Sequence, residues 1–371
     1  MKKKKVELIT LQRVPNYGSV LQAYATQKIL ESLNYEVEII NYFPERMTIK
    51  AMLRRIKKKK KKLNNSILMR TIARVIIIPS YIKRFSSFKK FYKNLNQTKK
   101  EYHSNEEIKK DLPVADIYCT GSDQVWNSEW NEGIDKALFL DFAPDNKKKV
   151  AISASFGKKS LNNDEITITK ELLSKYSNIS LREKSGVDIL KQLKIDNSIN
   201  ILDPTLLLNK QEWEIIASKK FTNEKYILVY NLNRNSKIDR YAENLSKETG
   251  LKIKYLSYQI HEFYKKGKMY CNPKVEDFLS LIKNAEYVIT DSFHGTAFSL
   301  NFEKEFVIVY PEKYSTRIQS ILELLDLKDR VAIDEKDLKV CEKKINYSTV
   351  SKKLNNERIK SIEWIKNALS N

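Results

Sequence analysis

The sequence predicts an α/β protein made of two Rossmann-like domains. Short apolar, β-prone segments alternate along the chain with longer segments whose apolar residues recur at helical spacing. The order strand, helix, strand occurs near the start and again after residue 225, and each such unit implies a parallel pair of strands. A chain of 371 residues also exceeds what one hydrophobic core usually organises, so two domains are expected.

The first domain is predicted to span residues 1–203. It opens with a strand at 6–10, a helix at 20–33 and a second strand at 36–41. Further short apolar segments predict strands at 115–120, 149–153, 179–182 and 199–203.

The second domain is predicted to span residues 204–371 and to end in a helical tail. Its first unit is a strand at 226–230, a helix at 238–249 that stops at Gly250, and a strand at 252–256. Further elements are predicted as a helix at 275–284 and strands at 287–290 and 306–310. Tandem domains of this kind bind ligands in a cleft beyond the carboxyl ends of their strands, where we expect the two domains to face each other.

A basic, partly apolar helical insertion is predicted at about 45–110. Residues 50–100 contain 18 Lys or Arg and no acidic residue, which leaves only +4 of the net charge of +22 to the rest of the chain. Arginines interrupt the apolar stretch that follows the lysine run at 57–62, before it reaches the roughly 20 apolar residues that a membrane-spanning helix needs. The pattern suits an anionic membrane surface. The alternative is a solvated basic loop.

Nucleic-acid binding is not expected from this charge. Tyr81, Phe85, Phe88 and Tyr92 recur at helical spacing, which indicates packing, and no zinc-finger or RNP-like pattern accompanies them. The three cysteines form no CxxC pair, so neither a zinc site nor a disulfide framework is suggested and a reducing compartment fits best. The chain begins as a buried strand and shows no signal-peptide pattern.

The turn at residues 290–297 is a candidate site because it joins a predicted strand to a predicted helix. The amino end of a helix presents backbone N–H groups that suit a phosphate or carboxylate. His294 in this turn could act as a general acid or base near neutral pH, and Ser292, Gly295 and Thr296 could contact the substrate. The alternative is that His294 only caps the helix or bonds to the backbone.

Two more polar turns follow predicted strands, at residues 16–19 and 121–127. The second is rich in polar side chains, among them Asp123, although Ser122 and Asp123 could instead cap a helix. We take the following positions of these turns as substrate-binding candidates: Asn16, Tyr17, Gly18, Ser122 and Gln124.

Arg182 and Arg317 could supply the cations that a phosphorylated donor requires. Each follows or begins a predicted element, and arginine binds phosphate or carboxylate in a bidentate manner. Either could instead form an internal ion pair, as Arg182 could with neighbouring Glu183.

Together these segments resemble the polysaccharide pyruvyl transferase family. The matching segments occur in family order, at residues 16–24, 121–127, 153–157, 180–183, 202–205 and 290–298. The resemblance runs to about residue 330 and does not cover the region from about 45 to 110 or the tail beyond about 335.

The resemblance implies a fold of the glycosyltransferase-B type, with no metal or organic redox cofactor. It implies that phosphoenolpyruvate donates a pyruvyl group to a sugar, forming a ketal across two hydroxyls and releasing phosphate. His294 is similar to the family's catalytic histidine and Arg182 to an arginine proposed for the donor site, while Asp123 lies in the family's cleft loop. We therefore expect His294 and Asp123 to be catalytic.

The expected acceptor is an oligosaccharide or lipid-linked glycan of a cell-surface polysaccharide, such as capsule or exopolysaccharide. The expected location is the cytoplasm, at the inner face of the cell membrane.

Ser292 departs from the family pattern, because some members have an arginine at this position. Arg317 or a lysine would then replace the cation, or this branch would use another donor. The alternatives are a nucleotide-sugar-dependent glycosyltransferase of the same fold, in which the turn at 291–296 would hold a diphosphate, and a non-catalytic membrane-associated binding protein.

Overall fold

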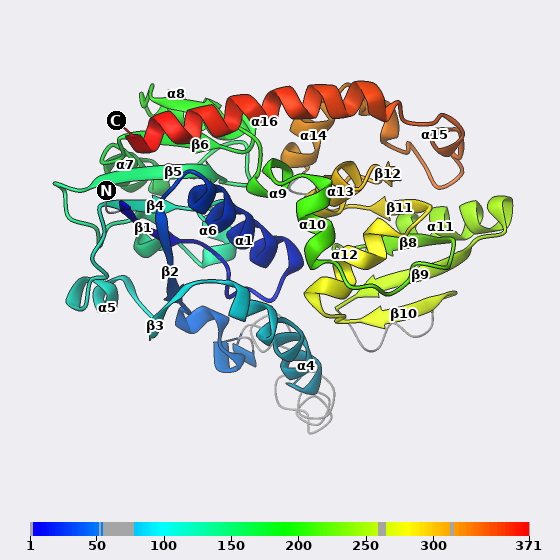
Figure 1. The fold of residues 1–371 in the computed structure, drawn as a ribbon, viewed down its shortest axis with the longest axis horizontal. Coiled ribbons are helices and arrows are strands. Elements are labelled where there is room, and N and C mark those ends of the chain that lie inside the picture. The colour runs from blue at the N-terminus through cyan, green and yellow to red at the C-terminus, as the bar shows by residue number, and fades with distance from the viewer. Residues whose placement is uncertain (1–2, 52, 55–77, 259–264, 312–314, 371) are drawn as a thin grey trace. The chain divides into compact units, whose positions relative to one another are not determined.

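A computed structural model describes residues 3–51, 53–54, 78–258, 265–311 and 315–370 (Figure 1). The chain divides into two compact units, residues 1–207 with 360–371 and residues 208–359. The first unit ends within a few residues of the predicted boundary. Residues 360–371, which the sequence placed in the second domain, belong to the first unit.

The first unit contains a seven-stranded parallel sheet in the order β3-β2-β1-β4-β5-β6-β7. Its strands are β1 Lys5–Ile9, β2 Glu36–Tyr42, β3 Gln97–Tyr102, β4 Ile117–Thr120, β5 Lys148–Ala154, β6 Asn178–Leu181 and β7 Ser198–Asn200. The central strands are buried on both faces, which explains why they appear in the sequence as short apolar runs.

Strand β3 lies inside the region predicted as a helical insertion. It forms an edge of the sheet, and its Thr98 and Tyr102 are buried while Lys99 and Lys100 are exposed. Because charged residues separate the buried positions of this edge strand, it contains no apolar run, so the sequence pattern does not reveal it. The predicted insertion at about 45–110 therefore includes part of the first sheet.

The helices of the first unit begin with α1, residues Tyr17–Ser32, which packs against β2 and α9. The side chain of Asn16 caps this helix by accepting a hydrogen bond from the Gly18 N–H at 2.9 Å. The other helices are α4 Ile78–Lys89, α5 Asn105–Lys110, α6 Ser128–Asn131, α7 Asn163–Leu173, α8 Lys184–Gln192 and α9 Pro204–Leu207, with 3-10 turns η1 Glu45–Met47, η4 Phe91–Asn94 and η5 Lys136–Phe139.

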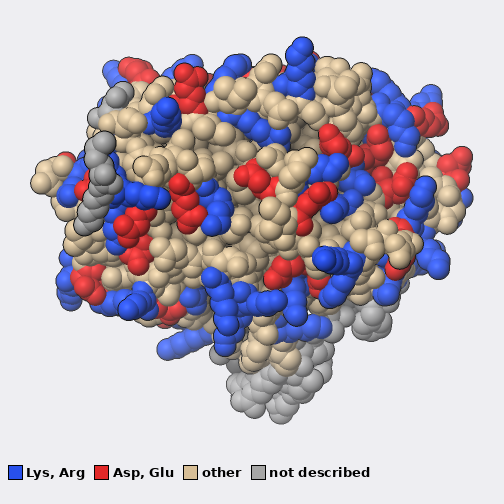
Figure 2. Space-filling view, in the orientation of Figure 1, with Lys and Arg blue, Asp and Glu red and all other residues tan. Residues whose placement is uncertain are grey.

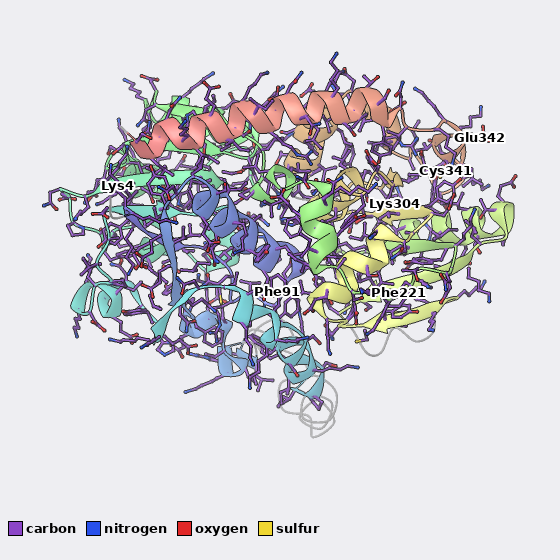
Figure 3. The ribbon with its side chains drawn as sticks, in the orientation of Figure 1. Lys4, Phe91, Phe221, Lys304, Cys341 and Glu342 are labelled. Carbon is purple, nitrogen blue, oxygen red and sulfur yellow. The ribbon has the colours of Figure 1, made fainter. Side chains whose placement is uncertain are left out.

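The aromatic face of α4 packs against other parts of the first unit. This confirms the packing role predicted for Phe88. The ring of Phe88 is buried and lies 5.0 Å from the ring of Tyr17 at the start of α1. Phe91 of η4, which Figure 3 labels, meets Tyr24 of α1 edge-on, with the ring centroids 5.7 Å apart. The predicted lysine run and the apolar stretch after it lie outside the described residues.

The second unit contains a five-stranded parallel sheet in the order β10-β9-β8-β11-β12. Its strands are β8 Tyr226–Tyr230, β9 Lys252–Ser257, β10 Lys268–Cys271, β11 Tyr287–Thr290 and β12 Glu305–Ile308. Its helices are α10 Lys210–Ile216, α11 Ser236–Thr249, α12 Val275–Lys283, α13 Phe293–Asn301, α14 Thr316–Leu324 and α15 Lys339–Glu342, with the 3-10 turn η7 Lys328–Arg330. Helix α16, Tyr347–Ser370, begins in this unit and ends in the first.

Both sheets have the strand order of a Rossmann fold, in which the first strand lies at the centre and the chain proceeds outwards on each side of it. The prediction of two Rossmann-like domains is therefore confirmed. Among the helices in the described part of the chain, none has both the length and the apolar character needed to cross a membrane.

Glu7 of β1 is a buried acid within the first sheet. Its side chain has no exposed surface, and its Oε1 lies 2.9 Å from the Lys5 ammonium, which also contacts Glu38 at 2.7 Å. Burial, and then hydrogen bonding with Glu38, raise the pKa of Glu7 to about 8, although Lys5 opposes this shift.

Native Glu7 should make the protein less stable as the pH rises from about 4.5 to about 8. The native state retains the Glu7 proton to a higher pH than the unfolded chain does. Ionisation of Glu7 in the unfolded chain therefore lowers the free energy of unfolding in that window by up to about 1.4 kcal/mol per pH unit. Glu7→Gln is expected to flatten this slope and to raise the free energy of unfolding at pH 8.5. Urea unfolding at several pH values would measure both effects.

Glu36→Gln provides the control, because Glu36 is an exposed acid at the start of β2. It should retain the pH slope of the wild type. Equal slopes for the wild type and Glu7→Gln would contradict the prediction.

Candidate functional site

The strand order of each sheet reverses direction once, between β1 and β4 in the first unit and between β8 and β11 in the second. Ligands of open α/β sheets bind beyond the carboxyl ends of the strands at such a switch point. The turn at 121–127 follows β4 and the turn at 290–296 follows β11, so both lie where the fold favours a ligand. Each unit therefore has its own candidate site.

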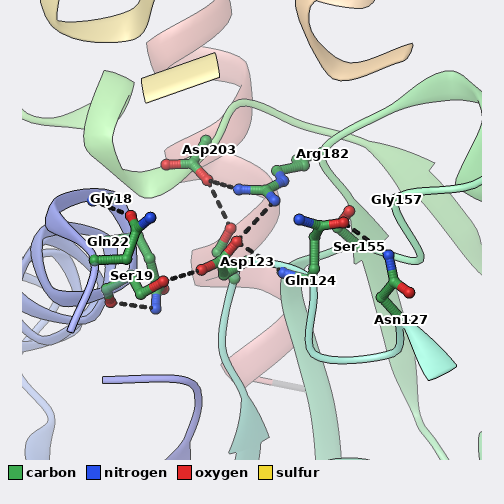
Figure 4. Close-up of polar contacts among 12 residues, drawn as sticks. Gly18, Ser19, Gln22, Asp123, Gln124, Asn127, Ser155, Gly157, Arg182 and Asp203 are labelled. Atoms are coloured by element: carbon green, nitrogen blue, oxygen red, sulfur yellow. Dashed lines mark hydrogen bonds and ion pairs between the residues drawn. The ribbon is translucent and has the colours of Figure 1, made fainter. Parts of the chain in front are cut away.

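The candidate site of the first unit is centred on Arg182, which directly follows β6 (Figure 4). We call it the Arg182 cluster, and it consists of Ser19, Ser122, Asp123, Arg182, Glu183, Asp203 and Thr205. The Arg182 side chain has no exposed surface. Its Nη2 donates to Asp123 Oδ1 at 3.0 Å and its Nη1 to Asp203 Oδ2 at 3.0 Å. Its Nε lies 3.9 Å from Glu183 Oε2.

Asp123 adopts a left-handed backbone conformation, with φ of 76°. Its Oδ1 also accepts a hydrogen bond from the Gln124 N–H at 2.8 Å, and its Oδ2 accepts one from Ser19 Oγ at 2.5 Å. The Asp123 side chain is 9% exposed, whereas Arg182 and Asp203 are fully buried. Of these three ion-paired side chains, Asp123 is the one that solvent reaches.

Asp203 accepts hydrogen bonds from Thr205, which is near it in the chain, and from Ser122 in the turn after β4. Its Oδ1 accepts hydrogen bonds from the Thr205 N–H at 2.9 Å and from Thr205 Oγ1 at 2.6 Å. Its Oδ2 accepts one from Ser122 Oγ at 2.7 Å in addition to the Arg182 ion pair. Asp203 is thus fixed at the start of α9.

Glu183 connects the cluster to the turn after β5. Its Oε1 accepts hydrogen bonds from Ser155 Oγ at 2.8 Å and from the N–H groups of Phe156 and Gly157, both at 3.2 Å. Gly157 has φ of +65°, and a Cβ at this position would lie 2.1 Å from Gln124 Oε1. The positive φ and this close approach therefore favour glycine where the turns after β4 and β5 meet.

The carboxylates around Arg182 keep its guanidinium charged. Burial by itself lowers the pKa of Arg182, but Asp123, Asp203 and Glu183 raise it, and the net shift is upward. Each carboxylate also accepts hydrogen bonds from hydroxyl or N–H groups. The cluster is a network of buried charges in which Asp123 can still meet a ligand.

The candidate site of the second unit is the turn between β11 and α13. Ser292 caps α13, because its Oγ accepts a hydrogen bond from the Gly295 N–H at 3.3 Å. Thr296 Oγ1 donates to the Ser292 carbonyl at 3.1 Å. His294 lies in the first turn of the helix, is 6% exposed, and has its ring centroid 5.2 Å from that of Phe293.

Asp291 fixes the neighbouring loop after β8. Its carboxylate accepts hydrogen bonds from the Leu232 N–H at 2.7 Å and from the Asn233 N–H and Nδ2 at 2.9 and 2.8 Å. Burial raises the pKa of Asp291, and these hydrogen bonds oppose the shift. Asp291 therefore joins the ends of β8 and β11 at the switch point of the second sheet.

The structure separates the predicted site residues into two groups. Ser122, Asp123, Gln124 and Arg182 meet in the first unit, and Ser292, His294, Gly295 and Thr296 share one turn of the second. The remaining candidates are placed as follows: Asn16 caps α1, Tyr17 is buried against α4, Gly18 donates to Asn16, and the half-buried Arg317 lies in the first turn of α14.

Ser19, Glu183 and Asp203 are absent from the sequence-based candidates. The signal that could have found them is their position inside the family-matching segments 16–24, 180–183 and 202–205. Among the described residues, no group of three or more His, Cys, Asp or Glu side chains is arranged to hold a metal ion.

The family model of the polysaccharide pyruvyl transferases matches residues 16–313. No curated protein matches the chain.

Several solved structures share the fold. A Listeria monocytogenes protein assigned as a UDP-N-acetylglucosamine 2-epimerase is similar over 95% of this chain and 91% of its own, with 11% identity and a TM-score of 0.53. The UDP-GlcNAc 2-epimerase of Methanocaldococcus jannaschii is similar over 100% and 99%, with 14% identity and a TM-score of 0.50. The spinosyn forosaminyltransferase is similar over 98% and 95%, with 9% identity and a TM-score of 0.50. At these identities the likeness shows the fold alone, which is of the glycosyltransferase-B type.

Gly295→Ala should destabilise the protein, because a Cβ at this position would lie 2.5 Å from Thr290 Oγ1. We expect a loss of about 1–3 kcal/mol in the free energy of unfolding, although alanine is otherwise favoured over glycine inside helices by about 1 kcal/mol. In a Thr290→Ala background the obstructing hydroxyl is gone, so Gly295→Ala should lower the free energy of unfolding by a smaller amount. Urea unfolding of the four proteins measures this coupling, and an equal cost in both backgrounds would exclude the steric explanation.

Proposed function

The chain belongs to the polysaccharide pyruvyl transferase family and is a transferase, and on this premise we propose that it moves a pyruvyl group from phosphoenolpyruvate to a sugar of a cell-surface or lipid-linked polysaccharide. The observation that carries the proposal is the family match over residues 16–313, which includes both candidate sites. The product is a ketal across two sugar hydroxyls.

The reaction requires proton transfers and stabilisation of negative charge. Protonation of the enol carbon of phosphoenolpyruvate allows one sugar hydroxyl to add at the neighbouring carbon and to lose its proton. A second hydroxyl of the same sugar then displaces inorganic phosphate from that carbon and closes the ketal. An acid, a base and groups that bind phosphate and carboxylate are therefore needed.

We assign a proton transfer to His294. An imidazole changes its charge near neutral pH, and this one lies in the first turn of α13, where the helix amino end favours a phosphate or carboxylate. Ser292 caps this helix in place of supplying a cation. Helix α14 packs against α13, so Arg317 in its first turn is our candidate for the missing cation.

We assign to Asp123 the contact with a sugar hydroxyl. A carboxylate held in one orientation can accept a proton or a hydrogen bond from an attacking hydroxyl. Support comes from its position after β4 at the switch point and from its partial exposure within an otherwise buried network.

We further propose that residues 50–100, which are rich in Lys and Arg, hold the enzyme at the inner face of the cell membrane, where a lipid-linked acceptor would be found. Lys83, Lys89 and Lys93 are exposed on α4 and η4, and Ile82 beside them is 54% exposed. Figure 2 shows Lys and Arg side chains gathered at the lower margin of this face, close to α4. Such a surface attracts anionic lipid.

Phosphoenolpyruvate should bind the protein and raise its melting temperature. A ligand at 100 times its Kd stabilises the native state by about 2.7 kcal/mol, so a thermal shift and isothermal titration calorimetry would both detect it. UDP-GlcNAc serves as the comparison. Binding of UDP-GlcNAc without phosphoenolpyruvate would overturn the proposed donor and favour a nucleotide-sugar glycosyltransferase in which the turn at 291–296 holds the diphosphate.

The role of His294 is tested in the same preparation by release of phosphate in the presence of acceptor glycans. His294→Gln should lower the rate by about 100-fold or more, with the affinity for phosphoenolpyruvate little changed. His103→Gln, at an exposed histidine after β3, is the matched control and should retain the wild-type rate. A fully active His294→Gln would exclude proton transfer by this residue.

Vesicles that contain anionic lipid should sediment the protein, and added salt should release it. Exchange of Lys89 and Lys93 for Gln is expected to weaken binding roughly tenfold or more, since each lysine near the lipid contributes about 1 kcal/mol. The same exchange at Lys247 and Lys252, two exposed lysines of the second unit, is the control. Equal binding to neutral vesicles would reject electrostatic attachment.

A further inference from the structure

We infer that Ser19, Arg182 and Asp203 are positioning residues that hold the Asp123 carboxylate in one orientation at the carboxyl end of β4. The inference rests on the proposed function, in which Asp123 meets the sugar hydroxyl. It gives Arg182 a role different from that of a donor-binding cation, and it adds Ser19 and Asp203 to the residues on which the reaction depends.

The guanidinium of Arg182 is already occupied by protein carboxylates. Its side chain has no exposed surface, and its two terminal nitrogens each lie 3.0 Å from a carboxylate, one of Asp123 and one of Asp203. A donor phosphate could reach it only by displacing one of these partners and leaving a buried charge unpaired, which is strongly unfavourable. The geometry therefore fits a residue that acts on Asp123 and not on the donor.

The backbone of Asp123 has to be held in place. A φ of 76° is uncommon for a residue other than glycine, and such conformations persist where the surroundings impose them. A bridge between Asp123 and Ala154 attaches this residue to the end of β5. Its carboxylate is held from two further elements, since Ser19 of α1 donates to Oδ2 and Arg182 donates to Oδ1.

Asp203 is the fixed end of this arrangement. It is fully buried and accepts three hydrogen bonds from Ser122 and Thr205, so it anchors one nitrogen of the Arg182 guanidinium. The other terminal nitrogen meets Asp123, whose side chain is 9% exposed. An anchored acid thus orients a cation, and the cation orients the carboxylate that solvent can reach. This is the logic by which a third group orients a catalytic pair in many enzymes.

The test compares Ser19→Ala, Arg182→Lys and Asp203→Asn in two measurements. Titration calorimetry gives the affinity for phosphoenolpyruvate, and phosphate release with acceptor glycans gives kcat. All three variants are expected to bind phosphoenolpyruvate within about threefold of the wild type while kcat falls by about tenfold or more, because small displacements of a reacting group are costly in rate. Ser32→Ala, at the exposed end of α1, is the matched control and should change neither quantity.

A tenfold or larger loss of phosphoenolpyruvate affinity in Arg182→Lys, with Ser19→Ala unaffected in kcat, would overturn the inference and identify Arg182 as a donor ligand. Should Arg182→Lys fail to fold, Ser19→Ala carries the test, because it removes one hydrogen bond and leaves every charge of the cluster paired. An unchanged kcat in Ser19→Ala would then overturn the inference.

Crystal structures of the wild type, Ser19→Ala and Asp203→Asn test whether Ser19 and Asp203 orient the Asp123 carboxylate. This test does not depend on the identity of the donor. We expect the Asp123 carboxylate to change its orientation in both variants, and a carboxylate that stays in place would overturn the inference. A wild type that binds no phosphoenolpyruvate would reject the proposed donor, whereas these structures would still decide whether Asp123 is positioned by its neighbours.

Discussion

The ion pairs of the buried Arg182 guanidinium hold together the carboxyl ends of the strands in the first unit. Asp123 follows β4, Arg182 itself follows β6, and Asp203 follows β7. Glu183 accepts hydrogen bonds from the turn after β5. A buried cation needs partners close by, so the loops that carry these acids cannot move independently of one another. The shape of this edge of the sheet thus depends on one side chain.

In the second unit, the loops at the carboxyl ends of the strands are fixed by hydrogen bonds and close packing and not by a buried cation. The Asp291 carboxylate binds the loop after β8 through three N–H groups, and the close approach of Gly295 to Thr290 lets α13 begin directly beyond β11. The turn that carries His294 is therefore shaped by backbone hydrogen bonds and by the absence of a side chain. In both units buried polar contacts fix the loops at the switch point of the sheet, which is where this fold binds ligands.

Most strands could be predicted from the sequence as short apolar segments, among them β7 and β12 at the edges of their sheets, whereas the edge strands β3 and β10 could not. Strands such as β8 and β11 are continuous apolar runs because helices or loops cover both of their faces. Strand β3, with the sequence QTKKEY, resembles a loop in composition, and β10 is only four residues long and has no fully buried residue. Their place in the fold follows from pairing with β2 and β9, which is a property of the assembled sheet.

The sequence by itself determined the two Rossmann-like domains, the family and the turns that carry polar residues, because periodicity and short motifs depend on neighbours along the chain. Only the tertiary structure decided what those residues contact. Arg182 could have paired with adjacent Glu183 or bound a ligand, yet its closest partners lie 59 and 21 residues away, at Asp123 and Asp203. Ion pairs of this kind form when parallel strands bring their carboxyl ends to one edge of a sheet, and no local pattern encodes which side chains will meet there.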